Sequence, residues 1–301
     1  MKQQFGPYSV EIGNREKVFY PGDGITKGDV IDYYQRVADR LIPHLKDRPV
    51  TLERYPDGID EEGFIQKKFP DYFPDWFDRK RVATEQGQQT VPVCNNLASL
   101  VYLANQGSVT QHVWLSRVDR PDIPDQMIFD LDPPGDDFSS VVGAARDCLE
   151  LLDELALTGF VKTTGSRGLH VMVPLRRLWN FDAVRDFARD CARVLVGRFP
   201  DRYTLEHRIE NRRGRLYLDV LRNAYGQTVV APYSLRPKAG APVATPLERG
   251  ALSNPELSAQ SYRLDNIFQY LGQKNAPWSG MRRHARGLSS AAKKLARILQ
   301  G

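Results

Sequence analysis

The pattern of apolar and polar positions in the first part of the chain predicts two helices and a strand. Helical spacing behind Thr26 and Asp29, which can form a capping box, predicts a first helix with Val30, Tyr33, Tyr34, Val37 and Leu41 on its buried face. Residues 95–105 predict a second helix that ends before Gly107, and residues 49–55 a strand. Residues 14–21 are strand-like. Together with an irregular aromatic region, these elements predict an N-terminal α/β module up to about residue 118.

The second part of the chain interleaves strand patterns with helix patterns. We expect strands at 127–132, 160–164 and 169–174, helices at 139–155 and 181–198, and a strand pair formed by 215–221 and 228–232 across the turn 223–227. Because strands and helices do not alternate strictly, the pattern favours an α+β fold with the helices on one face of a sheet. Residues 259–301 are expected to be mainly helical.

The strand at 127–132 carries two acidic residues in an apolar setting. Since side chains alternate along a strand, Asp130 and Asp132 share one face. Two neighbouring carboxylates repel one another when buried, and a hard divalent cation such as Mg²⁺ or Mn²⁺ relieves that repulsion. The alternative is structural: Asp132 begins a turn into Pro133, and Asp130 pairs with an arginine.

Composition narrows the classes of function. The 301 residues can build a proper core, and no run of about 18 apolar residues or apolar leader occurs. We therefore expect a soluble, cytoplasmic protein without membrane contact. Its three cysteines, Cys94, Cys148 and Cys191, lack metal-ligand spacing, which is typical of reduced packing thiols.

Positive charge is concentrated at the end of the chain. The formal net charge is +5, yet residues 280–301 contain several lysines and arginines and no acidic residue. Such a stretch is usually a solvated helix face, but it can also contact a phosphate backbone.

The motif from Lys162 to His170 combines small residues, cations and an imidazole around a tight turn. Gly165 and Gly168 allow backbone N–H groups to approach a phosphate, and a nearby hydroxyl and cation add contacts, so the motif can cradle a triphosphate. The candidate nucleotide ligands here are Ser166, Arg167, Gly168 and His170. The alternative is a plain β-hairpin in which His170 satisfies a core carbonyl.

A third carboxylate follows on another strand. Arg215, Tyr217 and Asp219 share one face, and Asp219 together with Asp130 and Asp132 would complete a two-metal centre for in-line phosphoryl chemistry. The alternative is an exposed edge carboxylate paired with Arg215 or Arg222.

In this order, the motifs resemble those of the polymerase domain of bacterial non-homologous end-joining DNA ligases (ligase D), in the archaeo-eukaryotic primase superfamily. The resemblance rests on Phe-Asp130-Leu-Asp132-Pro, Thr-Gly-Ser166-Arg-Gly-Leu-His170, Leu-Asp219 and Val-Ala-Pro-Tyr-Ser-Leu-Arg236. It continues upstream through Lys17-Val-Phe-Tyr-Pro, Thr26-Lys-Gly-Asp, Asp47-Arg-Pro-Val-Thr and Gly63-Phe64, and it reaches to about residue 275.

The resemblance implies a template-directed nucleotidyltransferase that fills gaps or extends ends during double-strand break repair. It implies a primase-like catalytic sheet with flanking helices, two Mn²⁺ or Mg²⁺ ions held by Asp130, Asp132 and Asp219, and a preference for ribonucleotides. His112 and Arg236 would join the turn motif in holding an incoming NTP or dNTP. Gapped DNA, a Ku-type protein and a DNA ligase are the partners it implies, and the nucleoid is the expected location.

The resemblance also implies a DNA-binding surface. Asn14, Lys17 and Lys27 match positions that grip the 5′-phosphate downstream of a gap, a task suited to lysine as a point charge. Phe64 matches an aromatic that stacks on the template, and Arg212 a loop arginine at the primer terminus. Arg54 and Lys67 are further candidate DNA contacts.

This chain departs from the family pattern at three positions. Glu53 stands where a lysine is common, Ile65 replaces a second aromatic after Phe64, and Arg249 replaces a tryptophan. These changes leave the acidic residues intact but affect the predicted nucleotide and template contacts. There is no Lys-x-Asp-Gly adenylation motif, so the chain is either one domain of a larger ligase or a separate polymerase.

By role, we expect an N-terminal module for DNA-end contacts at 1–118, a catalytic module at 119–275 that forms one compact unit with it, and a basic helical tail at 276–301. Two other functions remain open. One is a DNA-end-binding or recruitment module with a vestigial site, and the other is a metal nuclease or sugar-nucleotide transferase built on the same pair of acids. Extension of a gapped primer separates the polymerase from both.

Overall fold

The structure is a computed structural model that describes residues 1–84, 87–135, 137–273 and 277–300. By contact, the chain separates into two units, each assembled from segments that are distant in sequence. Unit 1 contains Met1–Asp119, Thr228–Ala244 and Tyr262–Gln273, and unit 2 contains Arg120–Gln227, Thr245–Ser261 and the described part of 274–301. The division by role predicted for 1–118, 119–275 and 276–301 stays a prediction.

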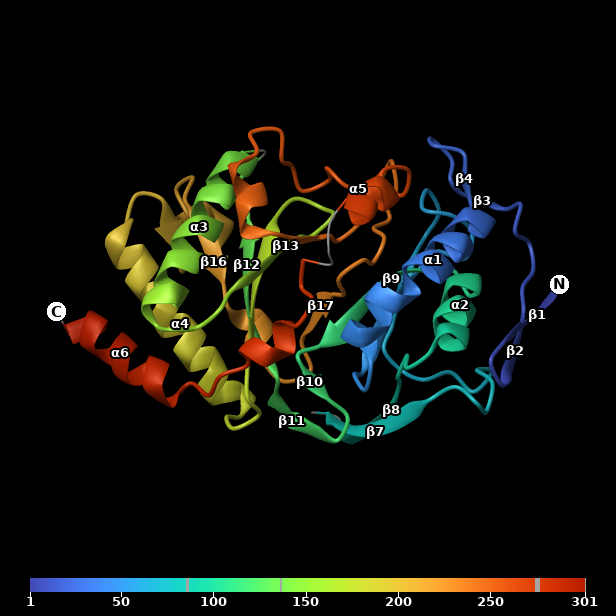
Figure 1. Ribbon diagram of the computed structural model, residues 1–301, viewed down its shortest axis with the longest axis horizontal. Helices are drawn as coiled ribbons and strands as arrows, with labels where there is room; N and C mark the ends of the chain where they lie inside the picture. Colours follow the sequence, from blue (N-terminus) through green and yellow to red (C-terminus); the bar gives the residue numbers. More distant parts are fainter. Residues whose placement is uncertain (85–86, 136, 274–276, 301) are drawn as a thin grey trace. The chain divides into compact units, whose positions relative to one another are not determined.

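Unit 1 is built around a four-stranded antiparallel sheet in the order β17-β9-β5-β6. The elements of this unit are β1 (Lys2–Phe5), β2 (Tyr8–Glu11), β3 (Val18–Tyr20), β4 (Ile25–Thr26), α1 (Lys27–Leu45), β5 (Val50–Arg54), β6 (Phe64–Gln66), β7 (Arg79–Thr84), β8 (Gly87–Pro92), α2 (Leu97–Asn105), β9 (Ser108–Trp114), β10 (Ser116–Arg117), β17 (Thr228–Val230) and α5 (Ile267–Gln273). Helices α1 and α2 pack side by side (Figure 1).

Helix α1 forms where its cap and apolar stripe predict it. Thr26 accepts a hydrogen bond from the Asp29 backbone, and the Asp29 side chain accepts one from the Thr26 backbone, which completes the capping box. All five apolar residues of the predicted stripe are buried. The Tyr33 hydroxyl donates to the Tyr233 carbonyl, 2.7 Å away, so the helix is also tied to the second segment of this unit.

Unit 2 contains a six-stranded mixed sheet in the order β15-β16-β12-β14-β13-β18, antiparallel except for the parallel pair β15 and β16. The elements of this unit are β11 (Arg120–Pro124), β12 (Gln126–Asp132), α3 (Phe138–Glu154), β13 (Phe160–Thr163), β14 (Leu169–Pro174), α4 (Phe181–Arg198), β15 (Tyr203–Thr204), β16 (Leu216–Asp219), β18 (Pro246–Leu247), α6 (Ser289–Gln300) and the 3₁₀ helices Ile209–Asn211, Leu221–Asn223, Arg249–Ser253 and Met281–His284.

Two helices cover the central strand of this sheet. Helices α3 and α4 contact one another and both pack on β12, so they lie on the same face of the sheet (Figure 1). Their buried stripes include Cys148 and Cys191, and Cys94 is buried in unit 1. The three cysteines form no disulfide, which confirms their predicted role as packing thiols. The hydrophobic core lies between these helices and the sheet. The alternate side chains of β12, including Asp130 and Asp132, point to the opposite face of the sheet.

The α+β fold class and most of the predicted elements are confirmed, but the predicted strand pair 215–221 with 228–232 is wrong. Strand β16 ends at Asp219 and pairs with β12 and β15, whereas β17 pairs with β9 in unit 1. The reason is Asn223, whose side chain accepts from the Ile128 N–H at 2.8 Å and donates to the Ile128 carbonyl at 2.7 Å. These bonds hold the connecting segment against β12, and no hairpin forms.

Candidate active site

Charged and polar residues form a row across four strands of the unit 2 sheet. Lys162 on β13 lies opposite His170 on β14, His170 lies opposite Asp130 on β12, and Asp130 lies opposite Asp219 on β16. Directly opposed residues of antiparallel strands share a face, and Asp132 is two positions further along on that face. The sheet therefore brings Asp130, Asp132 and Asp219 together, as predicted.

Asp130 is almost fully buried and already has partners. Its Oδ1 lies 3.2 Å from His170 Nε2, and its Oδ2 lies 3.4 Å from Arg222 Nε. Burial opposes its charge, but His170, Arg222 and Lys162 outweigh that effect and hold the pKa of Asp130 below its ordinary value. Pairing with an arginine was the structural alternative for Asp130, and Arg222 makes this contact.

His170 is neutral near neutral pH. Burial, followed by the charge of Lys162, lowers the pKa of His170 to about 4, so its contact with Asp130 is a hydrogen bond between imidazole and carboxylate. Its other ring nitrogen, Nδ1, is buried without a hydrogen-bond partner among the described residues. The imidazole is therefore held in place by Asp130, and not by a core carbonyl as the hairpin alternative assumed.

The other two carboxylates carry the electrostatic cost of being close together. Burial and the neighbouring charge of Asp130 raise the pKa of Asp132 to about 6, although Arg167 works in the opposite direction. Burial also raises the pKa of Asp219, whose Oδ1 accepts a hydrogen bond from the Leu221 N–H at 2.7 Å. Arg215 instead donates to the carbonyls of Arg212, Asn211 and Pro200, so the predicted alternative of an Asp219–Arg215 pair is wrong.

The donor set suits a hard divalent cation, but its side chains do not form a closed ligand group. Two of the three carboxylates have raised pKa values, and the binding of Mg²⁺ or Mn²⁺ would relieve the repulsion among them. Within the residues that the structure describes, no group of three or more His, Cys, Asp or Glu side chains is arranged to hold a metal ion. The residues thus fit a metal in kind, and each Asp130 oxygen, with a single partner in His170 or Arg222, keeps a lone pair for a cation.

The turn between β13 and β14 is organised by one hydroxyl. Thr164 Oγ1 accepts from the Ser166 N–H at 3.2 Å and the Gly168 N–H at 3.1 Å, and it lies 3.1 Å from the Gly168 carbonyl. Gly165 has φ +66°, a conformation that favours glycine. Gln260 donates to the Ser166 carbonyl at 2.9 Å. The turn is fixed while Arg167 is exposed at its tip.

Gly168 places this turn against the acidic strand. A Cβ at this position would lie 2.1 Å from the Leu131 carbonyl oxygen and 2.7 Å from Asp132 Oδ1. Only glycine fits here, and the absence of a side chain is what allows the turn and the Asp132 carboxylate to lie side by side.

His112 and Arg236, also predicted to bind nucleotide, belong to unit 1 together with Glu53. His112 Nε2 lies 3.2 Å from Glu53 Oε2. Burial opposes the charge of Glu53, but the hydrogen bond from His112 and the charge of Arg236 lower its pKa overall. The departure from the family pattern at position 53 therefore contacts a predicted nucleotide-binding residue directly.

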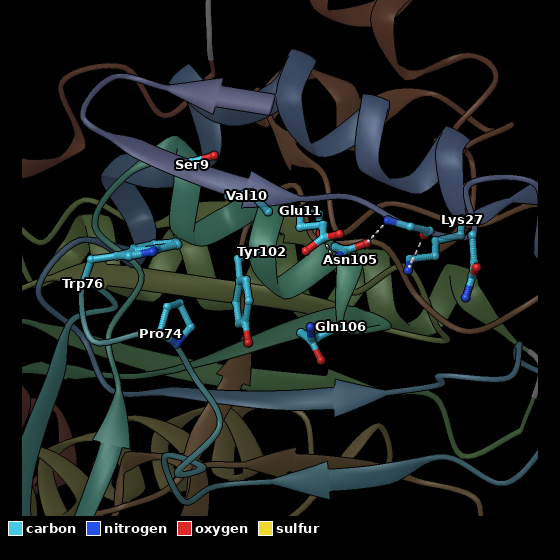
Figure 2. Close-up of a pocket in the computed structure, with 11 residues that line it drawn as sticks. Ser9, Val10, Glu11, Lys27, Pro74, Trp76, Tyr102, Asn105 and Gln106 are labelled. Carbon is cyan, nitrogen blue, oxygen red and sulfur yellow. Dashed lines mark hydrogen bonds between the residues drawn. The ribbon is translucent and has the colours of Figure 1, made fainter. Parts of the chain in front are cut away.

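The predicted phosphate-gripping residues lie close together in unit 1. Lys27 Nζ donates to the Gly13 carbonyl at 2.8 Å, and Lys17 pairs with Asp57. Burial, followed by the charge of Lys17, lowers the pKa of Lys27. Asn14 has φ +53°, which is uncommon for a residue other than glycine. Asn14 and Lys27 line a cleft of about 460 Å³ (Figure 2).

The other predicted DNA contacts differ in how exposed they are. Phe64 is 46% exposed on β6, with the guanidinium carbon of Arg54 5.1 Å from its ring centre, and Ile65 beside it is 55% exposed. Arg54 itself is buried and bonds Gln66, Tyr72 and Gln106. Lys67 is exposed.

Two arginines singled out in the sequence lie in unit 2. Arg212 donates to the carbonyls of Glu206 and His207, and its guanidinium covers the Tyr217 ring at 4.5 Å. Arg249 forms a double hydrogen bond with Asp153 at 2.6 and 2.9 Å, so the departure at this position is part of a surface ion pair.

Sequence reasoning did not assign a role to several residues that the fold brings to these sites. Lys162 and Thr164 begin the turn motif, but Lys162 and His170 share a face only through the pairing register of β13 with β14, which alternation along a single strand does not give. The sequence predicts Arg222 only as a partner of Asp219, whereas it contacts Asp130. For Trp76 and Tyr102, which line the cleft in unit 1, no local signal separated them from the other aromatic residues.

Within the described ranges, none of the helices is both long and apolar enough to cross a membrane.

Comparisons with a family model and with curated proteins point to the same family. A family model described as the primase-polymerase domain of LigD matches residues 26–278. The chain is 32% identical over 271 residues to the bifunctional non-homologous end joining protein LigD of Bacillus subtilis, covering 89% of this chain and 43% of that protein. It is 33% identical over 267 residues to the multifunctional LigD of Mycolicibacterium smegmatis, covering 88% of this chain and 35% of that protein. The chain thus spans less than half the length of these relatives.

A solved structure shows the same fold. The polymerase domain of Mycobacterium tuberculosis ligase D, in complex with DNA, matches with a TM-score of 0.86 and 30% sequence identity. The match covers 92% of this chain and 99% of that chain, so the similarity extends over both units.

Proposed function

Since the chain belongs to the family of LigD primase-polymerase domains, we propose that it is a template-directed nucleotidyltransferase that fills gaps and extends DNA ends in non-homologous end joining. Membership supports the general reaction, transfer of a nucleotide to a growing strand. This proposal also includes three finer points. They are the two-metal mechanism, the preference for ribonucleotides, and DNA-directed addition of both ribonucleotides and deoxyribonucleotides.

The observation that carries the proposal is the juxtaposition of acids from two strands. Asp130 and Asp219 are directly opposed on β12 and β16, and Asp132 shares their face. Placing a buried and two half-buried carboxylates side by side is unfavourable unless a cation joins them, and the raised pKa of Asp132 reflects this repulsion. A scaffold without chemistry gains nothing from such an arrangement.

Asp130, Asp132 and Asp219 would hold Mg²⁺ or Mn²⁺. When bound, such ions supply the positive charge that activates a primer 3′-hydroxyl and neutralises a triphosphate. His170 donates a hydrogen bond to one oxygen of Asp130 and so orients this carboxylate. Because the imidazole is neutral, it does not cancel the negative charge that the acids present to a cation.

The turn between β13 and β14 would receive the triphosphate of an incoming nucleotide. Its backbone is fixed by Thr164, and Gly168 brings it against Asp132, so phosphates bound at the turn would lie next to the acids. Ser166 adds a hydroxyl and Arg167 an exposed cation. His112 and Arg236 stay proposed nucleotide ligands within unit 1.

The DNA side of the proposal uses residues of unit 1 and, from unit 2, Arg212. The similar domain from M. tuberculosis was solved in complex with DNA. We assign Lys17, Lys27 and Asn14 to the 5′-phosphate of the downstream strand, Phe64, Arg54 and Lys67 to the template, and Arg212 to the primer terminus. A Ku-type protein and a DNA ligase activity would act with the domain at the nucleoid, and the ligase activity would come from the same or another chain.

The direct experiment is primer extension on a gapped duplex. The wild-type protein with Mn²⁺ and NTPs or dNTPs is expected to lengthen the primer according to the template, with NTPs used more efficiently. Asp130→Ala and Asp219→Ala should abolish extension while thermal unfolding still shows one cooperative transition. Asp201→Ala, an exposed acid in the same unit, serves as the matched control.

Extension by Asp130→Ala or Asp219→Ala at the wild-type rate would overturn the proposal. Shortened strands would instead indicate a metal nuclease, and glycosyl transfer a sugar-nucleotide transferase.

The second candidate, a DNA-end-binding module with a vestigial site, draws support from one observation. Asp130 is already engaged by His170 and Arg222, and no closed metal ligand group exists in the described residues. Under this alternative, gapped DNA would bind with equal affinity to the wild type and Asp130→Ala, and neither protein would add nucleotides.

A further inference from the structure

The cleft in unit 1 has two ends of different chemistry. In Figure 2, Trp76 and Pro74 lie at one end, Lys27 lies at the other, and Tyr102 and Gln106 lie between them. Its volume of about 460 Å³ is within the range of small-ligand pockets, roughly 300–1,000 Å³. A ligand that fills it would have to combine a planar apolar part with an anion.

The rings at the aromatic end of the cleft pack against one another and against their neighbours. The Trp76 ring stacks on Tyr8 with centroids 4.9 Å apart, and it meets Tyr102 edge-on at 5.9 Å. Tyr102 in turn packs edge-on against Phe73 at 5.0 Å. Because these contacts fix the rings, a base that stacks on them would not have to order mobile side chains.

The other end attracts an anion. Lys27 is nearly buried and its ammonium is bound only to the Gly13 carbonyl among the described residues, while Lys17 lies close enough to lower its pKa. An anion near Lys27 would offset this repulsion. Glu11 also lines the cleft, but its side chain is exposed and its backbone carbonyl is bound by Asn105.

Several polar groups on the cleft have no protein partner. Within the part of the chain that the structure describes, the side-chain amide of Asn14, the indole N–H of Trp76 and the hydroxyl of Tyr102 make no hydrogen bond. By contrast, the Asn105 amide is used, since it accepts from the Gly13 N–H and donates to the Glu11 carbonyl. The three unused groups are therefore available to a ligand with polar edges.

We propose that this cleft binds the unpaired 5′-terminal nucleotide of the strand downstream of a gap, with the phosphate at Lys27 and Asn14 and the base against Trp76 and Tyr102. The inference rests on the function proposed above and extends it. A site that binds only a phosphate has no use for aromatic side chains, so the aromatic end indicates that a base binds as well. A base that is paired in the duplex cannot enter the cleft, whereas a mismatched or frayed base leaves the stack at a small cost in free energy.

The binding experiment compares downstream ends that differ only in the terminal residue. Gapped duplexes carry a 5′-phosphate on a mismatched adenine, on an abasic residue or on a paired adenine, each matched by a duplex without the phosphate. Affinity is measured by fluorescence anisotropy with the wild-type protein in the absence of nucleotides, so that no extension can occur. Since base stacking contributes about 1–3 kcal/mol, the mismatched end should bind at least about 5-fold more tightly than the abasic end.

Variants separate the two ends of the cleft. Trp76→Ala should remove the advantage of the mismatched base and leave the abasic end unchanged, while Lys27→Ala should remove the advantage of the 5′-phosphate. Tyr102→Phe keeps the ring and should retain most of the advantage. Trp179→Ala, an aromatic of unit 2, is the matched control, and Trp76→Leu provides a second test if the alanine variant unfolds.

Equal affinities of the wild type for mismatched and abasic ends would overturn the inference. That result leaves primer extension and phosphate dependence intact, so it is distinct from failure of the proposed function. If both Trp76 variants still bind the mismatched end more tightly than the abasic end, the base binds elsewhere. That result would likewise overturn the inference.

Discussion

Gly168 shows how a single residue without a side chain determines the geometry of the candidate active site. Gly168→Ala would bring a Cβ to 2.1 Å from the Leu131 carbonyl oxygen, a backbone atom that cannot rotate away. We expect a loss of unfolding free energy of about 1–3 kcal/mol or more and a collapse of nucleotide addition. Urea unfolding and primer extension measure the two effects.

Gly135→Ala is the control for this substitution, because a Cβ there meets no atom within 4 Å and the change is expected to be neutral. A Gly168→Ala variant with unchanged stability would mean that the turn can move away from β12.

Glu53 illustrates how one departure from a family pattern changes the charge around predicted nucleotide ligands. Its carboxylate faces His112 and is within the field of Arg236. Glu53→Gln removes a negative charge beside His112 and Arg236, the predicted nucleotide ligands of unit 1, so we expect the KM for NTP to fall by roughly 3- to 10-fold with little change in kcat. Steady-state kinetics with the exposed acid Glu62→Gln as control test this. A rise in KM would instead show that Glu53 is needed to position His112.

At the scale of elements, the turn between β13 and β14 depends on a buried hydroxyl. Thr164→Val preserves the shape of the side chain but leaves the N–H groups of Ser166 and Gly168 without their acceptor. We expect a loss of about 1–3 kcal/mol in unfolding free energy and a several-fold rise in the KM for nucleotide. Thr158→Val is the control, because its hydroxyl has only a long contact of 3.4 Å. An unchanged KM would argue against triphosphate binding at this turn.

Elements were predictable where local chemistry decides them. The capped helix α1, the strand β14 and the helix α4 follow from periodicity and caps, and β14 and α4 have the bounds that the pattern indicates. Strand pairing was not predictable in the same way, since 215–221 and 228–232 read as a hairpin but pair with different sheets. The hairpins β1–β2 and β7–β8 were missed because their strands carry few apolar residues at regular spacing.

At the scale of the whole molecule, the sequence does not show which distant segments fold together. Residues 228–244 and 262–273 join unit 1, and 245–261 joins unit 2, although the chain passes between them without a distinct linker. The acids of the candidate site were predictable because alternation along one strand and a recognisable motif both point to them. The cleft in unit 1 was not, because its lining comes from four separate segments that only the fold brings together.

The stability of the folded protein should depend on pH and on metal ions together. The pKa of Asp132 is raised to about 6 by burial and by Asp130, compared with about 3.9 in an unfolded chain. A carboxyl group with a raised pKa favours the fold below the unfolded value, and this advantage is lost as the pH rises through about 6. At pH 7.5 the acids are therefore charged and their repulsion is fully present, whereas at pH 4.5 Asp132 is largely protonated. A divalent cation that binds the charged acids should offset this loss only at the higher pH.

We therefore expect Mn²⁺ at about ten times its Kd to raise the Tm by roughly 2–4 °C at pH 7.5 and by much less at pH 4.5. Differential scanning fluorimetry at both pH values measures the shift. Asp132→Asn should abolish it, and Asp201→Asn, an exposed acid of unit 2, should retain it. Because binding to scattered surface carboxylates would survive Asp132→Asn, a shift of the same size in that variant would show that the ion binds elsewhere. The close approach of the three acids would then need another explanation.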